Sequence, residues 1–211
     1  MSEGHRLRVV ALVSGGGSNL QALIDAQAAG LPFRIVAVVS NRADALGLDR
    51  ARRHGIPAEI LSHRDYPDRA SYDADLQRLI DRHDPGLVVL AGFMRILTPE
   101  FVNQYRGRML NIHPSLLPKF RGLHTHQRAL DAGETEHGAS VHFVTAELDG
   151  GPVILRARVP VLPEDDAATL AARVLEQEHR IYPAAVGWFA EERLRLGEDG
   201  RPWLDGAPTT R

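Results

Sequence analysis

Asn111, His113 and Asp149 have the residue types to act together on a carbonyl group. Asn111 and His113 lie two residues apart in a predicted strand over 109–113, so both side chains face the same side of it. An amide and an imidazole directed at one point polarise a carbonyl and stabilise a tetrahedral oxyanion. Asp149 lies in a glycine-flanked turn, and a contact with His113 would favour the charged imidazolium. The spacing fits equally well an interior histidine beside an unrelated turn aspartate.

A glycine-rich segment has the composition of an anion-binding loop. Residues 14–19 read Ser-Gly-Gly-Gly-Ser-Asn and lie between an apolar run over 7–13 and a predicted helix. Backbone N–H groups at a helix N-terminus bind phosphate, and glycines let the backbone approach it closely. The alternative is a tight strand-to-helix turn in which Ser18 or Asn19 caps the helix.

Two nucleotide-binding patterns compete for this segment. The P-loop pattern GxxxxGK[ST] is excluded because no lysine follows the glycines. Gly15 and Gly17 fit the start of the dinucleotide pattern GxGxxG, but Leu20 occupies the third small position. The next predicted strand ends without an acid for a ribose, although Arg42 could bind a 2′-phosphate. A small phosphorylated ligand therefore fits better than NADP, which remains an alternative.

Metal and serine-hydrolase chemistry have less support. The candidate metal ligands are the histidines His124, His126, His137 and His142. The chain has no cysteine and no HExxH motif, and 127–130 predicts the start of a helix. No GxSxG motif surrounds a serine, which excludes a nucleophile elbow. We therefore expect no metal site.

The first half of the chain alternates strand and helix patterns. Predicted helices near 20–24, over 44–54 and near 72–80 alternate with predicted strands over 7–13, 35–39, 58–61 and 87–91. This alternation predicts an α/β fold with a doubly wound, mostly parallel sheet and helices on both faces.

The second half predicts a different arrangement. Strands over 139–144 and 153–159 should pair antiparallel, because the turn between them is too short for a crossover. Asp165 or Asp166 should cap a long helix, which Pro183 should kink or restart. A terminal hairpin around Asp199-Gly200 and a frayed tail over 206–211 complete the predicted elements.

The composition indicates one soluble domain over 1–211. The 211 residues suit a single domain, and a formal net charge of −2 argues against a polybasic nucleic-acid binder. The absence of cysteine excludes a disulfide scaffold, an iron–sulfur cluster and a cysteine nucleophile. The apolar run over 181–190 is too short to span a membrane, and the first residues lack a signal-peptide pattern. We therefore expect a cytoplasmic protein.

Several motifs together carry a family resemblance. Asn-Ile-His-Pro-Ser-Leu-Leu-Pro over 111–118 is accompanied by Gly-Leu-His-Thr-His over 122–126 and Gln-Glu-His-Arg-Ile-Tyr-Pro over 177–183. With the segments 14–19, 91–97 and 148–152, these motifs resemble the phosphoribosylglycinamide formyltransferases, a branch of the formyl-folate transferase and hydrolase superfamily. The resemblance extends over about 8–204. It departs at Gly16, where some members have asparagine, and this change leaves the backbone cradle intact.

The resemblance implies a role for each motif. It implies catalysis by Asn111, His113 and Asp149. It implies binding of the nucleotide substrate by Gly17, Ser18, Asn19 and Glu178. It implies folate binding by Arg69, Met94, Arg95, Ile96, Leu97, Asn111, Thr145, Ala146, Glu147 and Leu148. Without the resemblance, Met94, Ile96 and Leu97 read as ordinary core. Arg69 then reads as a solvated helix charge and Glu178 as a surface acid.

The resemblance also implies a Rossmann-like formyltransferase fold and its organisation. The implied parts are a nucleotide-binding half over 1–100, a catalytic and folate-binding half over 101–190, and a C-terminal hairpin and tail over 191–211.

The implied reaction is formyl transfer from the co-substrate 10-formyltetrahydrofolate to the amine of glycinamide ribonucleotide, by direct attack through a tetrahedral intermediate. The implied partners are these two small molecules, with no nucleic acid and no membrane, and the protein would be a monomer or homodimer. The alternatives are another formyl-folate transferase, a deformylase or an NADP-binding oxidoreductase. We expect neither the further C-terminal domain usual in methionyl-tRNA formyltransferases nor the N-terminal extension usual in deformylases.

Overall fold

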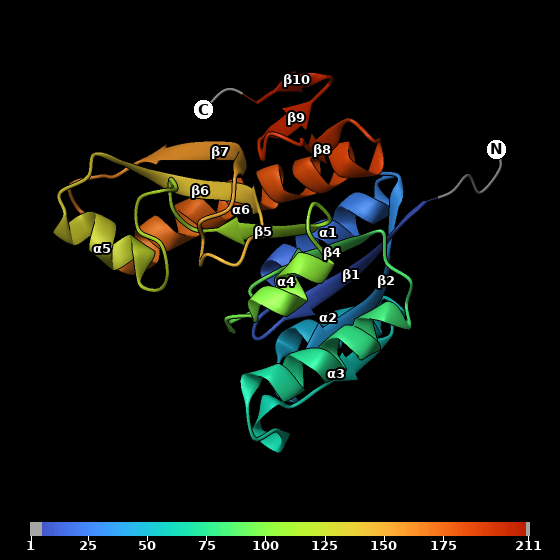
Figure 1. Cartoon of the computed structure of the whole chain (residues 1–211). Helices are drawn as coiled ribbons and strands as arrows, with labels where there is room; N and C mark the ends of the chain where they lie inside the picture. The colour runs from blue at the N-terminus through green and yellow to red at the C-terminus, as the bar shows by residue number, and fades with distance from the viewer. Residues whose placement is uncertain (1–5, 210–211) are drawn as a thin grey trace.

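A seven-stranded sheet forms the centre of the protein, as the computed structural model describes it over residues 6–209 (Figure 1). The strands are β1 (Leu7–Val13), β2 (Phe33–Ser40), β3 (Ala58–Ile60), β4 (Leu87–Leu90), β5 (Met109–His113), β6 (Glu136–Phe143) and β7 (Val153–Pro160). Their order in the sheet is β3-β2-β1-β4-β5-β6-β7. The pairs among β1 to β5 are parallel, whereas β6 pairs antiparallel with both β5 and β7. The mostly parallel sheet with antiparallel strands in the second half is confirmed.

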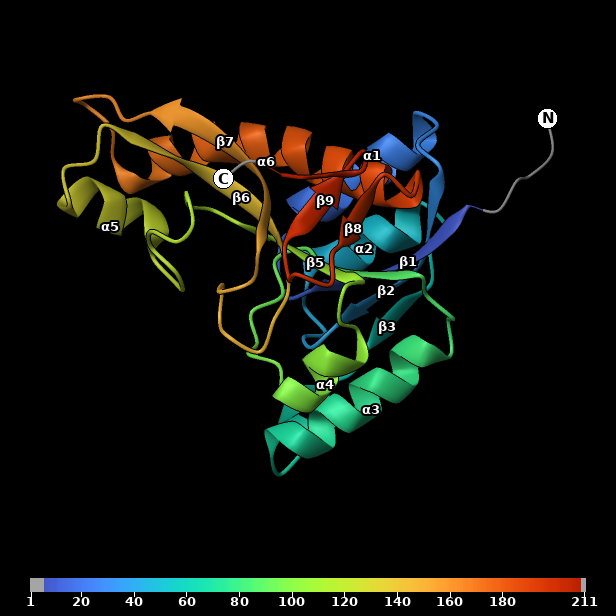
Figure 2. The same cartoon turned by 45° about the horizontal axis from the view of Figure 1, so that its top comes forward.

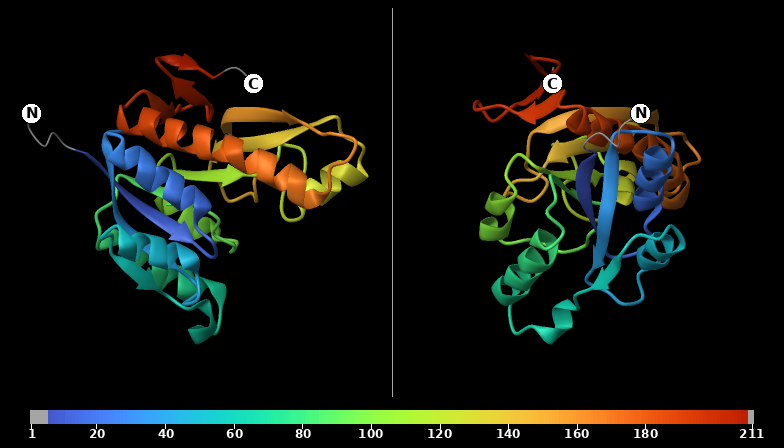
Figure 3. Two further views of the ribbon diagram at one scale, coloured as in Figure 1. Left: turned by 180° about the vertical axis from the view of Figure 1, so that it is seen from behind. Right: turned by 90° about the vertical axis from the view of Figure 1, so that its right-hand side faces the viewer.

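Helices cover both faces of the sheet. They are α1 (Ser18–Ala28), α2 (Leu46–Arg53), α3 (Arg69–Asp81), α4 (Pro99–Gln104), α5 (Thr125–Asp131) and α6 (Ala167–Ala190), with a 3₁₀ turn, η1, at His63–Asp65. In Figure 2, α1 and α6 lie above the strands β1 to β3, and α3 and α4 lie below them. Figure 3 shows α1 and α6 side by side, in agreement with their direct contact.

Two hydrophobic clusters correspond to these two faces. One cluster joins the apolar side chains of α1 and α6 to the sheet, and the other joins those of α3 and α4 to it. Alternate residues of β1 belong to each: Val9 and Ala11 to the first, Val10 and Leu12 to the second. Because a strand buried on both faces needs apolar residues throughout, the uninterrupted apolar runs of the first half form central parallel strands.

The long helix α6 continues through Pro183, so the restart predicted as one of two outcomes does not occur. Pro183 and the adjacent Tyr182 are buried, and the Tyr182 hydroxyl lies 2.8 Å from the carbonyl oxygen of Leu90 in β4. Packing against the sheet on both sides of the proline therefore outweighs the loss of one backbone hydrogen bond. Asp166 caps the helix, as one of the two predicted candidates, by accepting a hydrogen bond from the Thr169 backbone N–H at 2.8 Å. No helix within residues 6–209 is long and apolar enough to cross a membrane.

The C-terminal hairpin contains more structure than the sequence indicated. The predicted hairpin is confirmed as β8 (Leu194–Leu196) paired antiparallel with β9 (Pro202–Leu204). A third strand, β10 (Ala207–Pro208), pairs with β9, so a frayed tail is wrong for 206–209, and 210–211 lie outside the described residues. The positive φ angles of Asp205 and Gly206, 51° and 82°, make the tight reversal that the composition of the tail did not reveal.

Candidate active site

The polar motifs converge at the carboxyl edge of the parallel strands. The glycine-rich segment 14–17 follows β1, the segment 91–98 follows β4, and His113 ends β5. Open α/β sheets bind their ligands at this edge. The turn that joins β6 to β7 carries Asp149 to the same place, since Asp149 and His113 are in contact.

Asn111 is oriented by a histidine that the sequence analysis did not assign to the site. The Asn111 side-chain nitrogen Nδ2 lies 3.2 Å from Nε2 of His142, which is its register partner in β6. His142 Nδ1 lies 2.9 Å from the Phe143 carbonyl oxygen, so Nδ1 donates to it and Nε2 accepts from Asn111. Burial lowers the pKa of His142, which agrees with this neutral form. One Asn111 N–H is thereby fixed, and the other remains for a ligand.

His113 has both ring nitrogens beside groups that only accept hydrogen bonds. Nε2 donates to the Phe120 carbonyl oxygen at 2.9 Å, and Nδ1 lies 3.5 Å from Oδ2 of Asp149, within ion-pair distance. An imidazolium, which carries a proton on each nitrogen, satisfies both partners. The sequence left open whether Asp149 pairs with His113 or is an unrelated turn residue. The two side chains are in contact.

Asp149 also holds a neighbouring loop in place. Its φ is 48°, in the left-handed region, and its Oδ2 accepts a hydrogen bond from the Gly122 backbone N–H at 2.8 Å. An ion pair between Arg121 and Glu147 joins the same two loops a second time. Left-handed non-glycine residues cost conformational energy and cluster at functional sites. The carboxylate therefore connects His113 to the Gly-Leu-His-Thr-His motif.

Two further histidines, His126 and His137, lie near His113, whose charge acts on both. The rings of His126 and His137 meet edge to face, with centroids 5.2 Å apart. Burial lowers the pKa of His137 to about 4, so its neutral form prevails at physiological pH. Among residues 6–209, no group of three or more His, Cys, Asp or Glu side chains is arranged to hold a metal ion.

The glycine-rich segment presents an uncapped helix N-terminus. The N-cap residue of α1 is Gly17, with φ 69°, and no side chain accepts a hydrogen bond there. The alternative in which Ser18 or Asn19 caps the helix is therefore wrong, because both residues already lie within α1. The first N–H groups of a helix have no intrahelical partner, and an anion can take that place.

Gly17 must be glycine for steric reasons as well. A Cβ at this position would lie 2.6 Å from the Cα of Gly47 at the start of α2. We expect Gly17→Ala to lower the free energy of unfolding by more than about 1–2 kcal/mol, the cost of a left-handed non-glycine residue alone. Urea unfolding measures it. Gly16→Ala is the matched control, since its Cβ meets no atom within 4 Å, and equal losses in both variants would contradict the prediction.

Glu178 is a buried partner of this loop. The Asn19 side-chain nitrogen Nδ2 donates to Glu178 Oε2 at 2.6 Å, although the two residues belong to helices far apart in the sequence. Burial raises the pKa of Glu178, and the Asn19 hydrogen bond opposes this in part. The plainer prediction of a surface acid on α6 was therefore wrong.

The raised pKa of Glu178 predicts a pH-dependent stability. Between the ordinary and the raised pKa the folded protein binds more protons than the unfolded chain, so stability falls as pH rises through this window. Above this window the ionised carboxylate bears its full burial cost, so Glu178→Gln should raise the Tm on the alkaline side and flatten the pH dependence. The control is Glu176→Gln on the exposed side of α6. Parallel Tm–pH curves for Glu178→Gln and the unaltered protein would contradict the prediction.

A small cavity of about 90 Å³ lies against Asn111 and Asp149. The predicted folate residues that line it are Arg95, Ile96, Leu97, Thr145, Ala146, Glu147 and Leu148. His142 lines it too. The structure thus brings together the segment after β4 and the loop before Asp149.

Two predicted folate residues lie outside this cavity. Met94 lines a second cavity, which is formed by the glycine-rich segment 14–19 and its neighbours. The Met94 backbone N–H donates to Ser14 Oγ at 2.8 Å. Arg69 is exposed at the start of α3 and lines neither cavity. Met94 and Ile96 are 69% and 50% exposed, so the ordinary-core interpretation is wrong for them, whereas it holds for the buried Leu97.

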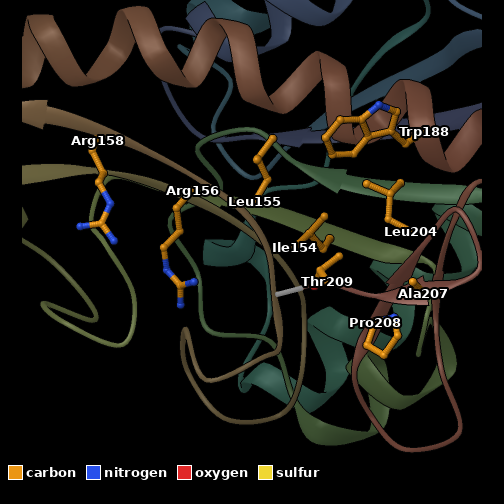
Figure 4. A pocket seen from close by; sticks show the side chains of 9 residues that line it. All are labelled: Ile154, Leu155, Arg156, Arg158, Trp188, Leu204, Ala207, Pro208 and Thr209. Atoms are coloured by element: carbon orange, nitrogen blue, oxygen red, sulfur yellow. The ribbon is translucent and has the colours of Figure 1, made fainter. Parts of the chain in front are cut away.

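A separate cavity of about 460 Å³ lies between β7, α6 and the C-terminal hairpin (Figure 4). Figure 4 shows Arg156 and Arg158 apart from an apolar group that includes Leu155, Trp188 and Leu204. None of the residues that line this cavity is a histidine or a carboxylate, so it contains no acid–base group for the same chemistry.

Comparison with known proteins agrees with this geometry. A family model described as formyl transferase matches residues 7–186. The chain belongs to the formyl transferase family. The matched range contains all the residues to which the resemblance gave a catalytic or substrate-binding role.

Individual relatives of this formyl transferase are similar over nearly its whole length. A phosphoribosylglycinamide formyltransferase of Escherichia coli is 55% identical over 95% of this chain and 94% of its own. The structure of phosphoribosylglycinamide formyltransferase from Coxiella burnetii has a TM-score of 0.94 at 53% identity, over 98% and 97% of the two chains. A formyltetrahydrofolate deformylase from Pseudomonas putida is more distant, at 32% identity and a TM-score of 0.84 over 95% of this chain and 70% of its own.

Proposed function

We propose that this chain transfers the formyl group of 10-formyltetrahydrofolate to the amine of glycinamide ribonucleotide, in purine biosynthesis. The observation that carries the proposal is the contact of His113 with Asp149, beside an oriented Asn111 amide, at the sheet edge that also holds the uncapped loop. Relatives named phosphoribosylglycinamide formyltransferase support the choice of acceptor. The NADP alternative has no comparable support.

The two substrates occupy neighbouring parts of the edge. The phosphate of the nucleotide binds the backbone of Gly17, Ser18 and Asn19, and Glu178, the partner of Asn19, is proposed for the same nucleotide. The pterin end of the folate lies in the cavity between 95–97 and 145–148, with Met94 at the border of the two sites. Arg69 is proposed for the glutamate tail of the folate, which fits its exposed position. Holding both reactants replaces a bimolecular encounter with an oriented one.

Formyl transfer then needs an oxyanion site and a proton route. The amine nitrogen forms a bond to the formyl carbon, and the resulting tetrahedral oxyanion accepts hydrogen bonds from the second Asn111 N–H and from the Nδ1–H of His113. Nδ1 is the nitrogen left for this role, because Nε2 is hydrogen-bonded to the Phe120 carbonyl and Nδ1 lies 3.5 Å from Asp149. The carbon–N10 bond of the folate then breaks. One proton passes from the attacking nitrogen to N10, carried by His113 or by a water held at Asp149. These steps form one C–N bond and break another without a covalent enzyme intermediate.

The remaining sequence predictions belong to this proposal. The single domain has a nucleotide-binding half over 1–100, a catalytic and folate-binding half over 101–190, and a hairpin and tail over 191–211. The two sites cross this division, because Glu178 lies in the second half whereas Arg69 and the segment 94–97 lie in the first. The protein acts on small molecules in the cytoplasm, without nucleic acid, membrane or metal, as a monomer or homodimer.

A coupled assay tests the proposed function. Purified protein is mixed with 10-formyltetrahydrofolate, and the folate product is followed spectroscopically with and without glycinamide ribonucleotide. The proposal expects product only when the nucleotide is present. Product without the nucleotide would identify a hydrolase, in line with the more distant deformylase similarity. Absence of product in both reactions, from folded protein, would reject both activities.

A further inference from the structure

The glycine loop by itself does not neutralise a phosphate ester. Such a group carries a charge of about −1.5 to −2 at neutral pH, and a helix N-terminus contributes only about half a positive charge. The segment 14–19 contains no cationic residue. Arg50 contacts the loop, with its Nε donating to the Gly16 carbonyl at 2.8 Å, but it does not line the adjacent cavity. The remaining counter-charge must come from another part of the site.

Arg42 and Arg64, which we call the cationic wall, line the same cavity as the glycine loop. This cavity measures about 550 Å³. Arg42 follows the end of β2, and Arg64 lies in η1 after β3. The register pairs Val13 with Ser40 and Ser40 with Ile60, so the ends of the three strands are adjacent. The wall therefore borders the loop on the β2 and β3 side, whereas His113 lies on the β5 side.

A chain of hydrogen bonds fixes the wall relative to the loop. Ser14 Oγ donates to Asn41 Oδ1 at 2.6 Å, and both residues are buried. Asn41 Nδ2 lies 3.2 Å from Nδ1 of His63, the residue before Arg64. The same Ser14 hydroxyl accepts the Met94 backbone N–H. The backbone that carries Arg64 is thus connected to the start of the glycine loop through side chains.

The wall keeps a net positive charge despite one neighbouring carboxylate. Arg42 forms two hydrogen bonds with Asp44, at 3.0 and 2.7 Å, and the two side chains are 55% and 70% exposed. Solvent screens an exposed pair of this kind, so it competes weakly with a phosphate. The pKa of Asp44 is lowered mainly by its hydrogen bond with Arg42 and also by the charge of Arg64, so both cations lie near this carboxylate. Two guanidinium groups thus face one acid.

We propose that Arg42 and Arg64 supply the counter-charge for a phosphate bound at the glycine loop, and thereby select a phosphate ester. Guanidinium groups suit this task because their paired N–H donors match phosphate oxygens. The identity of the substrate as glycinamide ribonucleotide rests on the proposed function. The inference that the ligand carries a phosphate does not rest on the proposed function, because it follows from the glycine loop and the cationic wall.

Binding of ribose 5-phosphate, measured by calorimetry without folate, tests the wall separately from formyl transfer. Arg42→Gln and Arg64→Gln should each weaken binding about tenfold, as expected for loss of a charged hydrogen bond, and the double variant should weaken it further. The double variant should also show a smaller dependence of Kd on salt concentration. Lysine at either position should restore most of the affinity because it keeps the charge. Arg34→Gln, exposed at the opposite end of β2, is the matched control and should bind normally.

The outcomes separate the two proposals. Unchanged affinity in the double variant, or no binding of ribose 5-phosphate by the unaltered protein, would overturn the cationic wall. An equal loss in Arg34→Gln would also overturn it, because the effect would then be one of overall charge. If the wall variants behave as expected while the coupled assay yields no product, the wall stands and the proposed reaction fails.

Discussion

His113→Ala should lower kcat by about 10²–10³, the usual cost of losing one oxyanion donor. The affinity for glycinamide ribonucleotide should change little, because His113 does not line the cavity beside the glycine loop. Stopped-flow single turnovers give the rate of transfer, and calorimetry gives the affinity for the nucleotide. The structural reason for a large effect is that the Phe120 carbonyl fixes the ring through Nε2, while Nδ1, 3.5 Å from Asp149, is left to donate to the oxyanion.

The control for this variant is a histidine outside the site. His54→Ala alters an exposed side chain just after α2 that contacts Gln21, and it should leave kcat and nucleotide affinity unchanged. Unchanged turnover in His113→Ala would remove this residue from the mechanism. A large loss of nucleotide affinity with normal turnover would instead assign it to substrate binding.

The sequence predicts the parallel half of the sheet well because local pattern and tertiary environment agree there. The apolar runs of β1, β2 and β4 are buried on both faces, and turn residues separate them from amphipathic helices. The same pattern places Asn111 and His113 on one strand and one side. Alternation along a strand is a local property, so one segment suffices to predict it.

The contacts that complete the site depend on long-range register. His142 meets Asn111 only because β5 pairs antiparallel with β6 in one particular register. Glu178 meets Asn19 only because α6 packs beside α1. His142 and Glu178 are both far in sequence from the residues that they contact. A histidine in a strand or an acid in a helix is usually structural, so residue type alone does not assign either one to the site. Family motifs pointed to Glu178, but no motif assigned His142.

The catalytic loops are the least predictable part for a different reason. Phe120 and Asp149 have positive φ angles, 54° and 48°, although neither is glycine. Such a conformation is fixed by the surrounding contacts and not by the residue type. A sequence pattern therefore locates these loops, while the contact of the Phe120 carbonyl with His113 follows only from their folded path.

Asp149→Asn should lower kcat by about 10²–10⁴, the range for losing a group that supports acid–base catalysis. The amide keeps an oxygen that accepts the Gly122 N–H, so the loop stays in place while the negative charge beside His113 is lost. Asp149→Ala removes both contacts and should lose at least as much. Hydrogen exchange of the Gly122 amide distinguishes the two variants, because only alanine frees it. Asp131→Asn, exposed at the end of α5, is the control.

The double variant decides how Asp149 acts. If the carboxylate works by stabilising the His113 imidazolium, His113→Ala with Asp149→Asn should be little slower than His113→Ala alone, because the second change removes support for a group already absent. If Asp149 also holds the water that carries the proton, the double variant should be slower than either single variant. If the losses of the two single variants add fully in the double variant, the 3.5 Å contact is not the source of the effect. The two side chains would then act in separate steps. The pre-steady-state rate of formyl transfer, measured for all four proteins, gives this comparison directly.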